Sequence, residues 1–216
     1  DGPEFTRLHS MISGAFRAVD YRRLALYAER STAELLDRLI ERGQFDVVAD
    51  LTNPIALSCI CECLGVETPD VAFIEPLADQ VAASMDSGLV PDAWQTGDCA
   101  RRQLTEIAVE WTRNHRSDGI VAHLAMSTLG ADMPTLAVAN NIRAVLMGGF
   151  SSWGSFLALS ILTLIAHPKA VKQIRATGLS SAVIHELIRY CSPVQAMSRA
   201  VAESAALGGE TIEPGD

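Results

Sequence analysis

Apolar residues recur at steps of three and four along most of this chain, which is the spacing of one face of an α-helix. Between positions 20 and 43, for example, Leu35, Leu36, Leu39 and Ile40 follow this spacing, and Gly43 supplies a typical helix stop. The same pattern predicts helices over 20–43, 54–64, 70–86, 92–115, 118–126, 134–166, 169–176 and 180–190. Residues 44–50 are predicted to be a short connector.

The pattern differs in the longest helical segment and at the end of the chain. Segment 134–166 is apolar on nearly all sides after Ala144, which favours a central, buried helix. Segment 194–216 instead carries short β-type runs that are broken by Gly208-Gly209 and Pro214-Gly215. We therefore expect one mainly α-helical unit over 1–216, helical over 1–190, with a small C-terminal hairpin or meander of short strands over 191–216.

Composition and charge narrow the classes of protein. The chain has 216 residues, of which 49% are hydrophobic and 20% charged, as in globular domains. The net charge is −9 and no stretch concentrates Lys and Arg, so we expect no nucleic-acid partner. The apolar run 156–166 is shorter than the roughly 20 residues of a membrane span, so we expect no membrane association. Five cysteines without the spacing of a disulfide framework, and no signal peptide, favour a cytoplasmic location.

The cysteines do not form a metal-binding motif. Cys59, Cys61 and Cys63 are two residues apart, and such positions point to different faces of a helix, so no metal site is expected there. Cys191 is followed by Ser192-Pro193 rather than by a glycine-rich loop, which favours a buried structural role. The chain also lacks the common hydrolase, Walker and dinucleotide-binding motifs.

Several separate stretches nevertheless follow one another in a known order. They are Asp1–His9 (DGPEFTRLH), Phe45–Asp50 (FDVVAD), Cys61–Val66 (CECLGV), Gly148–Ser152 (GGFSS), Glu186–Arg189 (ELIR), Ser192–Val194 (SPV) and Arg199. Together they resemble the middle of a bacterial cytochrome P450, from its C helix through its central I helix and K helix to the strands that follow. The resemblance implies a P450-like helical fold, truncated at both ends and without the loop that carries the haem-ligating cysteine.

The resemblance also implies roles for individual positions. Arg7, His9 and Arg199 stand at haem-propionate positions, which would matter only if haem binds, and Phe5 replaces the histidine of the same motif. The alternative for the two arginines is an ordinary surface or ion-pair role. Glu186 and Arg189 correspond to the structural ion pair of the K helix.

The I-helix positions of the resemblance are altered as well. Ser151 stands at the family's acid position and Ser152 at its threonine position, and Ser151 cannot supply a proton near pH 7. The alternative is that both serines, with the preceding glycines, only allow close helix packing. No catalytic residue is assigned with confidence beyond these two positions.

Three functional hypotheses remain open. The chain is a haem-free partner or auxiliary protein of a natural-product pathway, a fragment of a haem-dependent monooxygenase that oxidises a small apolar substrate, or a haem-free protein that binds or cyclises a small molecule. The candidate apolar groove consists of Met147, Gly148, Gly149, Phe150 and Trp153. No cofactor is expected for this chain by itself, and haem is expected if it belongs to a longer protein. A protein partner, a second copy of the chain and a small apolar ligand are the expected partners.

Overall fold

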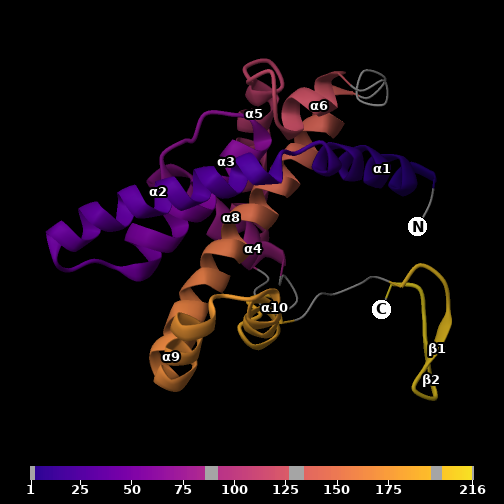
Figure 1. Cartoon of the computed structure of the whole chain (residues 1–216). Coiled ribbons are helices and arrows are strands. Elements are labelled where there is room, and N and C mark those ends of the chain that lie inside the picture. Colours follow the sequence, from indigo (N-terminus) through magenta and orange to yellow (C-terminus); the bar gives the residue numbers. More distant parts are fainter. Residues whose placement is uncertain (1–2, 86–91, 127–133, 196–200, 216) are drawn as a thin grey trace.

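The computed structural model describes residues 3–85, 92–126, 134–195 and 201–215 (Figure 1). It is mainly α-helical, which confirms the predicted fold class. The helices are α1 (Pro3–Arg17), α2 (Tyr21–Arg42), the π-helix η1 (Val47–Thr52), α3 (Asn53–Leu64), α4 (Val71–Met85), α5 (Ala93–Trp111), α6 (Ile120–Met126), α8 (Thr135–Ala166), α9 (Pro168–Thr177) and α10 (Ser181–Tyr190). The strands are β1 (Ala205–Leu207) and β2 (Glu210–Ile212).

The prediction of a connector over residues 44–50 is wrong for its second half. Residues 44–46 belong to no helix or strand, but η1 begins at Val47 and continues directly into α3. The side chain of Asp46 caps η1 by accepting hydrogen bonds from the backbone N–H groups of Val48 and Ala49, both at 2.8 Å. The first N–H groups of a helix lack partners within the helix, and the side chain of a capping aspartate satisfies them. This cap stabilises η1 although the helix is short.

The core lies where α8 crosses α3 and α5 in the middle of the molecule (Figure 1). Ile142, Leu146 and Phe150 form the buried face of the first half of α8. At Gly149, an added Cβ atom would lie 2.4 Å from the Cδ1 atom of Ile60 on α3. The absence of a side chain at Gly149 therefore allows α3 and α8 to pack closely.

Most of the second half of α8 is not buried, contrary to the prediction for the whole segment. Trp153, Leu162 and Ile165 are 53%, 63% and 71% exposed. Gly154 lies against Asn53 of α3, and Gly154 and Ser160 are the buried residues of this half. Beside its end lie α9 and α10, and neither contains a buried residue within its bounds. A helix that is apolar all round therefore keeps much of its apolar surface uncovered among the described residues.

Strands β1 and β2 form an antiparallel hairpin, in agreement with the strands predicted after residue 193. Gly208 and Gly209 form its two-residue turn with φ values of 63° and 91°, as a type I′ turn requires. Figure 1 shows the hairpin apart from the helices, and nearly all of its residues are exposed.

Two helical stretches, Val47–Leu64 and Thr135–Ala166, have the length and composition of membrane spans, with a mean hydropathy of 1.5 each. This is weak evidence, because the core helix of a globular protein satisfies the same criterion. The expectation of no membrane association therefore stays a prediction.

Candidate ligand groove and partner surface

One face of α1 leads to the candidate groove. Phe5, His9, Ile12 and Phe16 follow helical spacing, so they share one face of α1. The rings of Phe5 and His9 stack with their centroids 5.7 Å apart, and Ile12 and Phe16 continue this face into the groove. Arg7 lies two residues from His9 and is therefore on another face of the helix.

The groove lies between α1, α3 and α8 and has a volume of about 480 Å³. Its lining is mostly apolar and consists of Ile12, Phe16, Ile60, Asn141, Ala144, Val145, Gly148, Gly149 and Trp153. Gly148 faces open space, because a Cβ atom added there would meet no atom within 4 Å. A volume of this size and an apolar lining suit a small hydrophobic molecule.

Only some of the residues that the sequence predicts for the groove line this space. Gly148, Gly149 and Trp153 line it, whereas Phe150 is buried in the core and Met147 packs against that core. The prediction therefore needs correction at Met147 and Phe150. A rotation of about 100° per residue places Phe150 with Ile142 and Leu146, on a different face of α8 from the groove.

The two serines at the I-helix positions are half-buried in α8 and do not line the groove. The Ser152 hydroxyl donates a hydrogen bond to the backbone carbonyl of Gly148 at 3.1 Å. Such a bond within the helix fits the alternative in which the two serines have a structural role. It occupies the hydroxyl proton of Ser152 within its own helix.

Glu186 and Arg189 form a bidentate ion pair on α10, with both N–O distances at 2.8 Å. This hydrogen bonding lowers the pKa of Glu186 and raises that of Arg189. Both side chains are exposed, so solvent screens the pair and it contributes little to stability. Glu186 also borders a second hollow of about 510 Å³ between the end of α8, α9 and α10, where His167 and Tyr190 meet edge to face.

The two described haem-propionate positions, Arg7 and His9, do not line the groove. Arg7 and His9 are exposed on α1, and His9 lies 3.5 Å from the Ser13 hydroxyl, measured from its Nδ1 atom. Arg199 lies outside the described residues. The sequence-based roles of Arg7, His9 and Arg199 therefore stay predictions.

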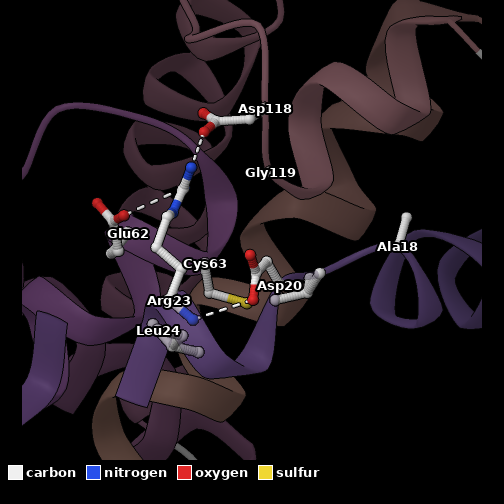
Figure 2. Close-up of a pocket in the computed structure, with 9 residues that line it drawn as sticks. Ala18, Asp20, Arg23, Leu24, Glu62, Cys63, Asp118 and Gly119 are labelled. Atoms are coloured by element: carbon white, nitrogen blue, oxygen red, sulfur yellow. Dashed lines mark hydrogen bonds and ion pairs between the residues drawn. The ribbon is translucent and has the colours of Figure 1, made fainter. Parts of the chain in front are cut away.

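A charged cluster that the sequence analysis missed joins α2, α3 and the segment before α6 (Figure 2). Arg23 pairs with Glu62 at 3.2 Å and also with Asp118, while Arg116 pairs with Glu62 at 2.8 Å and Asp118 at 3.2 Å. The hydrogen bond from Arg23 holds the pKa of Asp118 below its usual value. Two cations pair with two anions, and the space lined by Arg23, Glu62 and Asp118 is only about 80 Å³, so this cluster connects the elements rather than offering a ligand site.

The described cysteines are free, and none lines the groove. Cys61 and Cys63 are buried and Cys59 is half-buried on α3. Burial raises the pKa of the Cys61 thiol to about 12. Cys191 is also buried, and its sulfur lies 3.2 Å from the Thr163 hydroxyl, so it connects the end of α10 to α8.

Comparison with known proteins shows which class of protein the chain resembles. No family model matches the chain. The chain is 27% identical over 222 residues to mycinamicin VIII C21 methyl hydroxylase of Micromonospora griseorubida, covering 100% of this chain and 55% of that protein. It is 28% identical over 226 residues to 6-deoxyerythronolide B hydroxylase of Saccharopolyspora erythraea, covering 98% of this chain and 53% of that protein.

Solved structures agree with these relatives. The crystal structure of the mycinamicin hydroxylase bound to mycinamicin VIII matches all of this chain and 55% of that chain, with a TM-score of 0.83 and 27% identity. The crystal structure of CalO2 matches with a TM-score of 0.84 at 22% identity, which bears on the fold alone. The chain is therefore cytochrome P450-like, and it spans about half the length of the curated relatives that it matches.

The P450 family implies a thiolate-bound haem, and the described residues around the groove do not fit that group. No described cysteine reaches the groove to supply a thiolate. The aromatic ring of Phe5 cannot donate a hydrogen bond to a haem carboxylate, and it is stacked on His9 instead. These residues by themselves therefore do not supply the ligand set for haem.

Proposed function

We propose that the chain acts as a haem-free, P450-like auxiliary protein in a cytoplasmic natural-product pathway and that it works bound to a partner protein. The uncovered apolar surface of α8 and α10 is the observation that carries this proposal. Leu162 and Ile165 on α8 are 63% and 71% exposed, and Ile188 and Tyr190 on α10 are 50% and 62% exposed. We name these four residues the α8–α10 surface.

An exposed apolar surface of this kind supports a protein partner. Soluble monomers rarely leave large contiguous apolar patches in water, because covering them with apolar atoms is favourable. Aromatic and aliphatic side chains, with little charge among them, form the centre of typical protein interfaces. The α8–α10 surface offers such side chains on two neighbouring helices.

Altered motif positions support the haem-free part of the proposal. Phe5 and His9 stack on each other at positions where the family resemblance implies haem-propionate partners. Ser151 cannot act as a proton donor in the way that an acid could. The natural-product pathway is supported by the relatives, which are named as hydroxylases of mycinamicin VIII and 6-deoxyerythronolide B.

The groove favours a second candidate function, the binding of a small apolar molecule without redox chemistry. Its volume of about 480 Å³ and its apolar lining support this function. Replacing Gly148 with leucine would fill the groove, because the space beside Gly148 is open. If the groove binds an apolar probe such as 1-anilinonaphthalene-8-sulfonate, this variant should abolish the part of the fluorescence that saturates.

Sedimentation velocity with two matched double variants tests the partner proposal. Leu162→Gln with Ile165→Gln removes apolar groups from the α8–α10 surface. Leu26→Gln with Ile40→Gln is the control, because these α2 residues are similarly exposed, at 60% and 68%. We expect the purified chain to self-associate when no partner covers this surface, and we expect only the α8 variant to reduce that association.

Equal self-association of the two double variants would contradict the proposal. The visible spectrum of the protein isolated from the cells that produce it distinguishes the remaining hypothesis, a fragment of a haem-dependent monooxygenase. A band near 450 nm after reduction and carbon monoxide would favour the monooxygenase, because that band requires thiolate-bound haem. The auxiliary role predicts that no such band forms.

A further inference from the structure

Two arginines lie where α5 and α8 pack together, each about one helical turn from the contact of 3.4 Å between the Thr105 hydroxyl of α5 and the Asn140 Oδ1 atom of α8. Neither arginine lines the groove or belongs to the α8–α10 surface. Arg101 lies on α5 and Arg143 lies on α8. The Nη2 atom of Arg101 and the Nε atom of Arg143 are both shielded from solvent, and neither has a hydrogen-bond partner. A buried, unsatisfied donor on a charged group is costly, so it calls for an explanation.

The other atoms of Arg101 are held in place. Its Nη1 atom donates to the Ser84 hydroxyl of α4 at 2.7 Å, and its guanidinium lies over the Trp94 ring at 4.8 Å. The nearest carboxylate, Asp98, is 3.7 Å from its Nη2 atom, which is too long for a hydrogen bond. Asp98 instead forms its closer contact, at 2.6 Å, with Arg102.

Arg143 has no acidic partner among the described residues. The Thr105–Asn140 contact places Arg101 and Arg143 on facing turns of α5 and α8. Burial lowers the pKa of the Arg143 guanidinium, and repulsion from Arg101 lowers it further. Arg101 and Arg102 share the single carboxylate of Asp98, and Arg143 adds a third positive charge without an acidic partner in the described part of the chain. This excess of positive charge lies in a chain whose net charge is −9.

The geometry points to a binding site for a small oxyanion, a carboxylate or a phosphate group of a small molecule, held between the free N–H groups of Arg101 and Arg143. Guanidinium groups are suited to this task because their N–H donors match the spacing of oxygen atoms on carboxylate and phosphate. An oxyanion would satisfy both unpaired donors and offset the repulsion between the two cations. Packing against Trp94 and Ser84 holds Arg101 ready for this contact, which lowers the entropy lost on binding.

Nuclear magnetic resonance of the arginine Nε–H groups tests the site directly, with inorganic phosphate and acetate as probes at constant ionic strength set by chloride. We expect the Arg143 signal to move saturably with at least one probe. The stronger probe would assign the ligand as a phosphate or a carboxylate. The exposed Arg38 on α2 is the control, and its signal should move little and without saturation.

Substitutions test the oxyanion site without relying on the Arg143 signal alone. Arg143→Gln should weaken binding about tenfold or more, as expected for the loss of a charge-assisted hydrogen bond, whereas Arg38→Gln should leave binding unchanged. Asp98→Asn should tighten binding roughly threefold or more, because it removes the competing carboxylate. Absence of saturation with both probes, or equal affinities in wild type and Asp98→Asn, would overturn the proposal.

Discussion

Replacing Gly65 with alanine should destabilise the protein far more than the same change at Gly43. Both glycines follow the end of a helix, at positive φ values of 78° and 81°. They differ in their surroundings. A Cβ atom at Gly43 would meet nothing within 4 Å, whereas one at Gly65 would lie 2.0 Å from the backbone oxygen of Asp118 and 3.2 Å from the Cα atom of Gly119.

The magnitude follows from three contributions. A positive φ costs a non-glycine residue about 1–2 kcal/mol or more, and a cost of this kind applies at both positions, although only Gly65 has the ψ value of the left-handed α region. At Gly65 the methyl group also overlaps backbone atoms, which no side-chain rotation can relieve, at about 1–3 kcal/mol. Moving the two backbones apart would also break the 2.8 Å hydrogen bond from Arg116 N–H to the Gly65 carbonyl, worth about 1 kcal/mol.

We therefore expect Gly65→Ala to lower the free energy of unfolding by roughly 2 kcal/mol or more beyond the loss in Gly43→Ala. Urea denaturation of the two variants and the wild type, followed by circular dichroism at 222 nm, measures this difference. Equal losses would refute the close approach between the end of α3 and the start of α6.

Three further predictions concern ionisation, thiol reactivity and helix packing. Because Arg23 lowers the pKa of Asp118 from its usual value of 3.8, the stabilising effect of this pair is present above that pH and is lost as pH falls through the lowered pKa. The stability difference between wild type and Asp118→Asn should therefore shrink in acid, and a difference that does not vary with pH would contradict the pairing. Iodoacetamide at pH 8 should modify the exposed Cys99 well before Cys61, because burial raises the pKa of the Cys61 thiol to about 12. Mass spectrometry of the digested protein measures this order, and earlier modification of Cys61 would contradict the prediction. Gly149→Ala should destabilise by about 1–3 kcal/mol, since its methyl group would overlap an isoleucine of α3, and a stabilised variant would disprove this packing.

Much of the fold could be predicted from the sequence because helical periodicity is a local signal. The long α8 and the hairpin at Gly208-Gly209 both follow from patterns within a few residues of each other. The helical character of residues 47–50 was missed, because η1 depends on the side chain of Asp46 and on direct continuation into α3. A short capped helix and a connector have similar patterns of hydrophobic residues, so the pattern alone does not distinguish them.

Burial and site composition were harder to predict, since they depend on contacts distant in sequence. The apolar second half of α8 has the pattern of a buried helix, but the described elements leave Trp153, Leu162 and Ile165 exposed. Phe150 was placed in the groove by its neighbourhood in sequence, whereas its direction on α8 places it in the core. The Arg23–Asp118 pair joins residues 95 positions apart, and periodicity carries no signal for such a contact.

The visible spectrum of the protein isolated from the cells that produce it tests the central claim most directly. The haem-free auxiliary role predicts no Soret absorbance, whatever the mass of the natural protein. A Soret band that moves to 450 nm after reduction and carbon monoxide would contradict that role. It would instead identify the chain as part of a haem-dependent monooxygenase.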